Sequence, residues 1–273
     1  MEELKVKFLR DCWDNNQEGV RDCLARGVDV NTLSEAGWFG LAIAAEGNYL
    51  ELLEIFLSHP QIKINNIGNK QQHWHKQTAL TVACRCGNSA IVTRLVQVPG
   101  LDINLQDGCG FTAVHHCSGV GETECLRIMA ETGKVDWNKK DKYGETPLFW
   151  ALRVGHSDVV DFIVQQPHID YNVRTNDGKT LAQAAVSGGG VKCVETLAAQ
   201  DRCDCWNVPD SDGDTPIMKA LKEGKTEIVE ILLGCPRVDL SCKDKEGWSL
   251  LFRAFERNDL GEKSTTMVIN HSS

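Results

Sequence analysis

The segment Thr146-Pro147-Leu148-Phe149-Trp150-Ala151-Leu152-Arg153-Val154-Gly155 contains the local signals of one complete short helix. A threonine at the start can accept a backbone N–H and cap the helix, and a proline directly after it suits the first turn. The glycine at the end readily takes the left-handed conformation that stops a helix. The segment therefore predicts an apolar helix that begins after Thr146 and ends before Gly155.

The same signals recur along the chain at a nearly constant interval. Successive capping threonines are 34, 34, 34 and 35 residues apart, and Ser249 follows 34 residues after the last of them. These threonines are Thr78, Thr112, Thr146, Thr180 and Thr215. A second marker, the motif Val135-Asp136-Trp137-Asn138 and its variants, keeps the same interval, and its asparagine position lies 26 residues after each threonine. After Thr180 this position falls on Trp206. Two markers in step indicate internal repeats.

Each repeat also predicts a second helix. Apolar pairs such as Val159-Val160 and Ile228-Val229 follow the glycine, and Pro167 comes after the helix that it ends. Two helices followed by an Asp-x-Asn loop resemble ankyrin repeats, and the resemblance covers residues 1 to about 258. It implies an all-α solenoid of helix-turn-helix units with short β-hairpin loops.

We expect a single ankyrin-repeat domain over residues 1–258, with about seven and a half repeats. The predicted repeats are residues 3–34, 35–69, 74–107, 108–141, 142–175, 176–210, 211–244 and 245–258. The last is incomplete, because its second helix would fall on the polar run Glu262-Lys263-Ser264-Thr265-Thr266. Residues 259–273 are predicted to be a mobile tail.

Composition excludes several classes of protein. A chain with 42% apolar and 25% charged residues is typical of a folded soluble domain. Its apolar runs are too short to cross a membrane, and its net charge of −9 disfavours binding to nucleic acid. Twelve cysteines in a chain without a signal-peptide pattern predict free, mostly buried thiols in a reducing compartment. We therefore expect a monomer in the cytoplasm or the nucleus.

The sequence contains none of the common catalytic or metal-binding motifs. It lacks the Gly-x-Ser-x-Gly elbow, a Walker loop, a His-Glu-x-x-His pair and any Cys-x-x-Cys pair. These observations predict that the protein is not an enzyme and holds no cofactor or metal. The alternative from another class is a cysteine-rich metal- or redox-responsive module. Its candidate ligands are Cys203, Cys205, Cys235, Cys242, His73, His75, Cys84 and Cys86.

The ankyrin resemblance implies that the loops and the first helices line a concave groove that binds partners. Aromatic residues gather at the predicted groove positions of the second to fifth repeats, whereas the sixth and seventh repeats are polar there. Aromatic and arginine side chains dominate binding hot spots, so we predict a non-catalytic scaffold for another protein or an extended peptide. The predicted contact residues are Trp38, Trp74, His75, Arg85, Phe111, His116, Tyr143, Trp150 and Arg153. The competing interpretation is that some of these rings only pack onto neighbouring loops.

The resemblance also implies roles for single residues. His115 occupies the position of a structural histidine that is bonded to the loop backbone. Asn31, Asn104, Asn138 and Asn172 lie at the loop position where ankyrin-like asparagines are hydroxylated. Amide side chains there also lock the loop through hydrogen bonds, and we expect this to be their main role.

Overall fold

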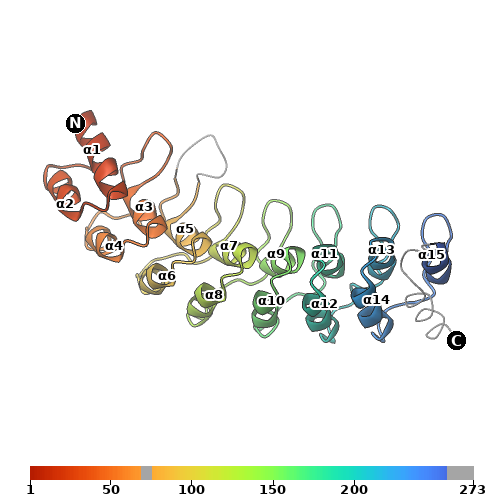
Figure 1. Ribbon diagram of the computed structural model, residues 1–273. Helices are drawn as coiled ribbons and strands as arrows, with labels where there is room; N and C mark the ends of the chain where they lie inside the picture. The colour runs from red at the N-terminus through yellow and green to blue at the C-terminus, as the bar shows by residue number, and fades with distance from the viewer. Residues whose placement is uncertain (69–75, 257–273) are drawn as a thin grey trace. The chain divides into compact units, whose positions relative to one another are not determined.

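The computed structural model describes residues 1–68 and 76–256. Within this part of the chain the regular structure is α-helical, and it contains no β-strand. The chain divides into two compact units, an N-terminal unit Met1–Lys142 and a C-terminal unit Tyr143–Ser273. The all-α repeat fold that the sequence predicts is confirmed, and Figure 1 shows the helices in their pairs.

The N-terminal unit contains four helix pairs. Their bounds are Glu2–Trp13 (α1), Gln17–Ala25 (α2), Gly40–Glu46 (α3), Leu50–Leu57 (α4), Ala79–Arg85 (α5), Ser89–Val96 (α6), Ala113–Val120 (α7) and Thr123–Ala130 (α8). The first helix of each pair packs against the first helix of the next pair, from α1 through α3 and α5 to α7. The second helices α2, α4, α6 and α8 form a parallel layer in the same way.

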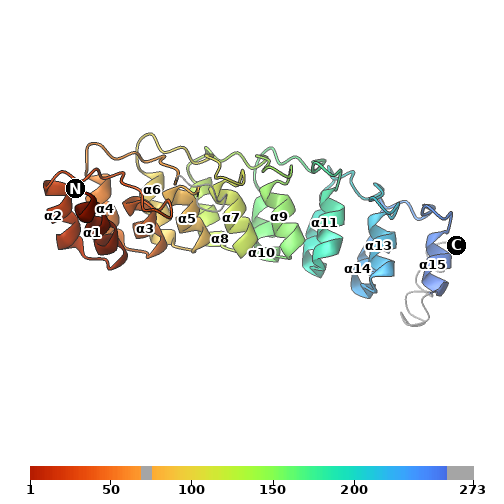
Figure 2. The same cartoon turned by 90° about the horizontal axis from the view of Figure 1, so that it is seen from above.

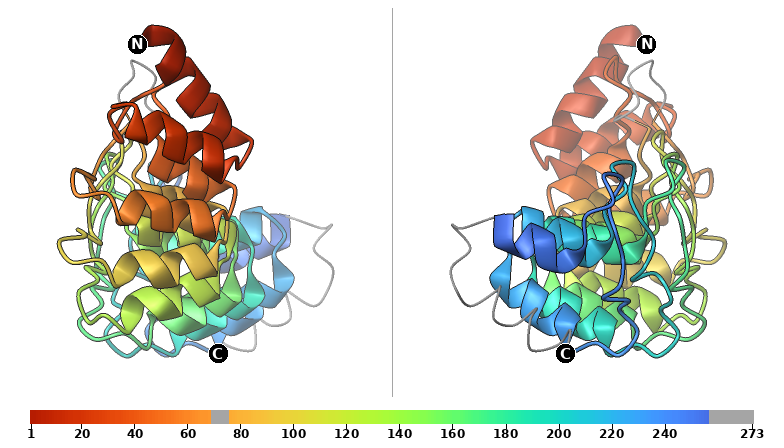
Figure 3. Two further views of the ribbon diagram at one scale, coloured as in Figure 1. Left: turned by 90° about the vertical axis from the view of Figure 1, so that its left-hand side faces the viewer. Right: turned by 90° about the vertical axis from the view of Figure 1, so that its right-hand side faces the viewer.

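The C-terminal unit repeats this arrangement. Its helices are Pro147–Val154 (α9), Ser157–Ile163 (α10), Leu181–Gly188 (α11), Val191–Ala198 (α12), Pro216–Lys222 (α13), Thr226–Leu233 (α14) and Leu250–Glu256 (α15). The layer of first helices runs from α9 through α11 and α13 to α15, and α10, α12 and α14 form the second layer. Figure 3 shows the two layers with the helices of each unit one behind another.

The capping threonines begin the first helices as the sequence predicts. Thr78 accepts the backbone N–H of Thr81, Thr146 that of Phe149, and Thr180 that of Gln183. Thr215 is also an N-cap residue, but its side chain makes no capping hydrogen bond. The glycine that follows α5, α7, α9, α11 and α13 has positive φ in each case, and Asn48 after α3 takes the same conformation with φ 56°.

The core of each unit lies between its two helix layers. The apolar residue two positions after the cap is at most 2% exposed in every repeat with a threonine cap. These residues are Leu80, Val114, Leu148, Ala182 and Ile217. Gly188 is a second requirement of the packing, because a Cβ there would lie 2.3 Å from the Leu152 carbonyl oxygen. A glycine at position 188 therefore lets α11 approach α9 closely, and the left-handed Gly189 after it ends the helix.

The loops between repeats project to one side of the helices in each unit, as Figure 2 shows. Where the sequence resemblance implies short hairpins, the described loops carry single antiparallel bridges. These bridges join Leu33 to Phe39, Arg174 to Thr180, and Lys243 to Ser249. Neighbouring loops come into direct contact: the Asn176 amide donates to the Tyr143 carbonyl at 2.9 Å. Glycine at position 144 permits this approach, because a Cβ there would lie 2.7 Å from the Asn176 side chain. Gly144 also has a positive φ of 78°.

Candidate functional site

Asparagine side chains link each loop to the next one. The Asn104 amide nitrogen donates to the Lys134 carbonyl, and its Oδ1 accepts the backbone N–H of Asp136, both at 2.8 Å. The same pair of bonds recurs at Asn31, Asn65 and Asn172. Each amide thereby uses its donor and its acceptor at once, so these asparagines hold the loops in register. We call this recurring contact the asparagine clamp.

The clamp corrects one position of the sequence alignment. The 26-residue interval places Trp206 in the asparagine position, but Trp206 is buried and 1% exposed. The neighbouring Asn207 forms the clamp instead, with Nδ2 donating to the Arg237 carbonyl at 2.8 Å and Oδ1 accepting the Asp239 amide at 2.7 Å. The additional residue of the 35-residue repeat therefore lies between Asp204 and Asn207.

Three of the four asparagines predicted to be hydroxylated are clamp residues. Asn31, Asn104 and Asn172 each bond the loop of the next repeat, and the Asn138 backbone amide donates to Asp136 Oδ1. The side chains of Asn31, Asn104 and Asn172 therefore have the structural role that the sequence predicts. Hydroxylation stays a prediction, which mass spectrometry of protein isolated from cells tests at each of the four residues.

In the N-terminal unit the predicted contact rings are partly covered by neighbours. Trp38 is half-buried and packs edge-on against Trp13, with ring centroids 5.4 Å apart. Phe111 is half-buried against His116 at 5.6 Å, and His116 Nε2 lies 2.8 Å from Asp107 Oδ2. The packing interpretation accounts for much of these rings' surface, and Trp13, 43% exposed, adds an aromatic face that sequence reasoning missed.

The structure describes one of the three other predicted residues of the N-terminal unit. Arg85 extends from α5 to Glu46 at the end of α3, with 3.2 Å between Nη2 and Oε1. A partner carboxylate would therefore have to compete with Glu46 for this guanidinium. Trp74 and His75 lie outside the described residues.

His115 occupies a structural position. It is 2% exposed, and its Nδ1 accepts the backbone N–H of Thr112 at 3.1 Å. Thr112 is the N-cap residue of α7, so the His115 imidazole helps to cap the helix in which it lies. This arrangement leaves His115 no role at the surface.

The predicted residues of the C-terminal unit are more accessible. Tyr143 is 62% exposed at the tip of its loop. The Arg153 guanidinium lies over the Trp150 ring, 4.2 Å from the ring centroid, and Arg153 also pairs with Glu145 at 3.3 Å. Val154 at the end of α9 is 46% exposed. Aromatic, cationic and aliphatic surface thus occur together at α9 and the loop before it.

A groove of about 550 Å³ lies beside these residues, between the loops and the first helices of the C-terminal unit. Its floor is formed by α9, α11 and α13, and its wall by the loops around residues 174–179 and 209–212. The lining residues are Glu145, Phe149, Arg153, Arg174, Asp177, Gly178, Lys179, Gln183, Ala184, Ser187, Pro209, Asp210, Ser211, Asp212 and Lys219.

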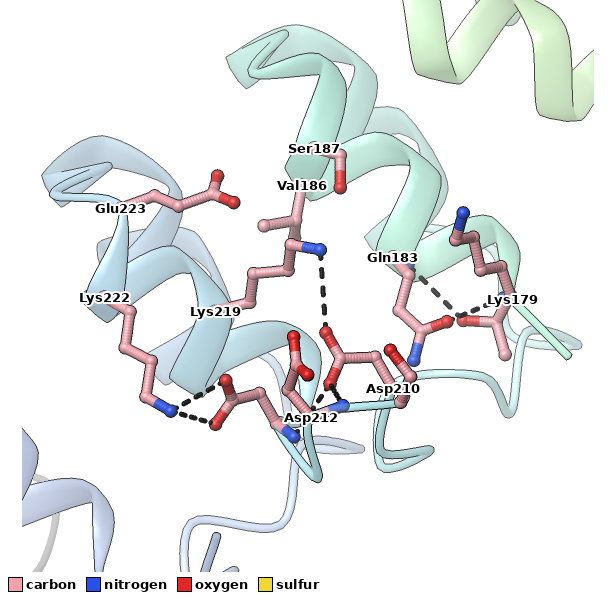
Figure 4. A network of polar contacts seen from close by, with 12 residues as sticks. Lys179, Gln183, Val186, Ser187, Asp210, Asp212, Lys219, Lys222 and Glu223 are labelled. Atoms are coloured by element: carbon pink, nitrogen blue, oxygen red, sulfur yellow. Dashed lines mark hydrogen bonds and ion pairs between the residues drawn. The ribbon is translucent and has the colours of Figure 1, made fainter. Parts of the chain in front are cut away.

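Charged side chains in the groove are organised in pairs. Figure 4 shows Lys219 of α13 reaching Asp210, 3.5 Å away, while Asp210 Oδ1 accepts the backbone N–H groups of Asp212 and Asp214. Lys179 pairs with Asp177 at 2.8 Å. The hydrogen bond from Lys179, with a second one from the Thr175 hydroxyl, holds the pKa of the Asp177 carboxyl below its usual range.

Buried polar contacts connect the groove wall to its floor. Gln183 of α11 accepts the Thr180 N–H through Oε1 and donates to the Val208 carbonyl through Nε2 at 3.0 Å. Asp214 is 5% exposed, and both of its carboxylate oxygens lie within 2.8 Å of Lys222 Nζ. These bonds fix the 209–214 loop against α11 and α13, so the groove is preformed.

Sequence reasoning identified part of this groove. Arg153, a predicted contact residue seven positions after its cap, lines the groove, and Ser187 lines it at the same position of the next repeat. The floor residues Phe149, Gln183 and Lys219 were missed. They lie three or four positions after the cap, and the i to i+4 relation to the predicted positions is the signal that identifies them.

The twelve cysteines are free thiols, and most of them are buried. Burial raises the pKa of Cys193 to about 11 and raises those of Cys84 and Cys117 as well. Among residues 1–68 and 76–256, no group of three His, Cys, Asp or Glu side chains is arranged to hold a metal ion. His73 and His75 of the proposed metal cluster lie outside the described residues.

In the part of the chain that the structure describes, no helix is both long and apolar enough to cross a membrane. A family model described as ankyrin repeats (3 copies) matches residues 9–107, 91–175 and 167–244. The matched ranges cover both units and include every capped first helix from α5 to α13.

Proposed function

Since the chain belongs to the ankyrin-repeat family, whose members are generally protein–protein interaction modules, we propose that it is a non-catalytic scaffold that binds an extended peptide segment of another protein. The proposed binding site is the groove of the C-terminal unit together with Tyr143, Trp150 and Arg153. The N-terminal unit contributes a second surface through Trp13, Trp38, Arg85, Phe111 and His116. The proposal includes a monomeric state and a cytoplasmic or nuclear location, as the sequence predicts.

The observation that carries this proposal is the combination of an exposed aromatic ring with a preformed groove. Tyr143 keeps 62% of its surface exposed although its loop is held by the backbone bond to Asn176. A ring on a fixed loop loses little conformational entropy on binding, which favours tyrosine in contact surfaces. The adjoining groove, about 550 Å³ in volume, is large enough for several peptide side chains.

The charge pairs suit a peptide that carries both signs of charge. Arg153 and Glu145, Lys179 and Asp177, and Lys219 and Asp210 are within 3.5 Å of one another. These pairs are partly exposed and each is weak in water, so a partner group can replace one member of a pair at small cost. Apolar contacts at Trp150 and Val154 would then supply most of the affinity.

Peptides selected from a random phage-displayed library against the wild-type protein provide the probe. We expect Tyr143→Ala and Trp150→Ala to weaken their binding by about 30-fold, equivalent to about 2 kcal/mol. Lys179→Ala is the matched control, because Lys179 is also exposed on a neighbouring loop of the same groove. Circular dichroism establishes that each variant is folded.

The outcome decides between the two units. Equal loss of affinity in the control and the aromatic variants would contradict the role of the rings. Peptides that respond only to Trp38→Ala or Phe111→Ala would place the main binding surface in the N-terminal unit. If none of the variants changes peptide binding, the proposed binding site is wrong.

A further inference from the structure

Two cysteine sulfurs are in direct contact in the loop that follows α12. The Sγ atoms of Cys203 and Cys205 are 2.7 Å apart, and the residues are 0% and 3% exposed. In an extended segment, residues two apart point to the same side, which brings these two thiols together. A disulfide requires about 2.05 Å between its sulfurs, so bond formation needs little movement of the chain.

The backbone around the pair is anchored to two neighbouring repeats. The Asp204 N–H donates to the clamp residue Asn172 at 3.1 Å, and the Thr180 hydroxyl donates to the Cys205 carbonyl at 3.4 Å. The next repeat contributes Arg237, whose Nη1 donates to the Gln200 carbonyl at 2.6 Å. The two thiols are therefore held in contact by the fold, because the residue between them and the segment on either side are fixed.

The electrostatic surroundings favour a reactive thiolate at one member of the pair. The hydrogen bond from Cys205, with a contribution from the Arg237 guanidinium, lowers the pKa of Cys203. The same contact raises the pKa of Cys205, which keeps its proton. A thiol that ionises more readily beside one that keeps its proton is the arrangement from which a disulfide forms by stepwise oxidation.

No such pair occupies these positions in the neighbouring repeats. Val135 and Ile169 hold the position of Cys203 in the two preceding repeats. Counted back from the clamp asparagine, the buried rings of Trp137 and Tyr171 correspond to Trp206. The repeat with the cysteines is also the one that carries the additional residue before its clamp asparagine. A cysteine pair at this loop position is therefore particular to this repeat.

We propose that Cys203 and Cys205 form a reversible dithiol–disulfide site that is oxidised by hydroperoxides. With hydrogen peroxide, the Cys203 thiolate sulfur attacks one peroxide oxygen, so that an S–O bond forms, the O–O bond breaks, and the released hydroxide is protonated to one water. The Cys205 sulfur then attacks the sulfenic acid at Cys203; the S–S bond forms, the S–O bond breaks, and the Cys205 proton leaves with hydroxide as a second water. Two thiols are oxidised and one hydroperoxide is reduced.

Access to the buried sulfurs requires a local opening of this loop and not unfolding of the repeat. Asp201, Arg202, Asp204 and Asn207 are exposed, so the two cysteines lie only one side chain below the surface. Local openings of exposed loops occur far more often than global unfolding. Oxidation is accordingly slower than at an exposed thiol but leads to a disulfide that the folded chain accommodates.

Peptide mapping of the full chain after treatment with hydrogen peroxide tests the proposal. Remaining thiols are alkylated, the protein is digested, and the fragment with both cysteines is weighed. We expect this fragment to lose two hydrogen atoms and to escape alkylation, and dithiothreitol to restore both thiols. Cys203→Ser should abolish the cross-link, whereas Cys193→Ser, another buried cysteine in the same repeat, should leave it unchanged.

The exposed Cys86 serves as an internal measure of oxidant strength. If Cys203 and Cys205 are still fully alkylated at the end point of the peroxide treatment, long after Cys86 is completely oxidised, the proposal is overturned. Oxidation of Cys203 to a sulfinic acid without a cross-link also overturns it. The wild-type map decides the question by itself, so a folding defect in Cys203→Ser does not affect the conclusion. The test is independent of peptide binding, and either proposal can fail without the other.

Discussion

Substitutions at Thr146 and Leu148 allow the contributions of a helix cap and of a core contact to the free energy of unfolding to be measured separately. Thr146 Oγ1 accepts the Phe149 N–H at 3.4 Å, whereas Leu148 is 1% exposed. We expect Thr146→Ala to lower the free energy of unfolding by about 1 kcal/mol and Leu148→Ala by about 2–5 kcal/mol, because the second change leaves a cavity. Urea denaturation measures both. Thr146→Ser keeps the hydroxyl and should stay near wild type; a larger loss from the cap variant than from Leu148→Ala would contradict the assignment of the two positions.

Asp161 gives a prediction about pH. The hydrogen bond from Lys192 at 2.6 Å, followed by the one from the Thr196 hydroxyl at 2.7 Å, lowers the pKa of the Asp161 carboxyl. Because the folded-state pKa lies below the unfolded value of about 3.9, the ion pair stabilises the protein above that value and this contribution disappears as pH falls through the folded pKa.

Asp161→Asn should therefore lower stability at neutral pH, and the difference from wild type should shrink below about pH 4. Urea denaturation of both proteins over this pH range provides the test. Asp158→Asn is the control, since this carboxyl is exposed and 3.6 Å from the same lysine. A difference that stays constant with pH would show that the effect of Asp161→Asn does not come from its charge.

The sequence identified which residues stand near the surface but not what they contact. His116 was predicted one position after a structural histidine, yet its partner Asp107 lies nine residues earlier in the preceding loop. Trp150 and Arg153 were predicted as separate contact residues, and the structure stacks one on the other. A repeat pattern gives the direction in which a side chain leaves the helix, whereas its partner depends on loops whose paths the pattern does not describe.

The asparagine clamp is the feature that joins one element to the next. Asn104→Ala removes its bonds to the Lys134 carbonyl and the Asp136 amide. Water can replace these exposed partners in part, so we expect a loss of about 1–2 kcal/mol in the free energy of unfolding. Hydrogen exchange at the Asp136 amide should accelerate at the same time. Asn104→Asp keeps the acceptor and should retain slow exchange there; unchanged exchange in Asn104→Ala would mean that the clamp does not protect the loop.

The helices themselves were predictable from the sequence, because threonine, proline and glycine mark their ends locally. Pro147 and Gly155 delimit α9 as expected. The clamp at Asn207 was not predictable. A spacing of 35 residues shows that one residue has been added, but it does not show whether that residue comes before or after the asparagine position. The need for glycine at position 188 was not predictable either, because it follows from the close approach of the Leu152 carbonyl oxygen on another helix.

At the scale of the whole molecule, we expect a core substitution to destabilise its own repeat and the adjacent repeats, and to leave distant repeats unaffected. Leu148→Ala lies in the C-terminal unit, where it weakens packing between α9 and its neighbours α10 and α11. Since a repeat is stabilised by itself and its neighbours, we expect faster hydrogen exchange across residues 147–198 and little change across residues 1–96. Exchange measured by mass spectrometry decides this, with Leu80→Ala as the reciprocal control. Uniform acceleration along the chain would indicate a single cooperative fold.

The shifted clamp at Asn207 bears on how such a chain can change length during evolution. A residue inserted between the aspartate and the asparagine of a loop, as between Asp204 and Asn207, leaves the next repeat in register because the amide still reaches the following loop. An insertion within a helix would instead rotate every later side chain away from its layer. Length variants should therefore survive selection preferentially at this point, and a library of single-residue insertions scanned for folded protein would be richest there.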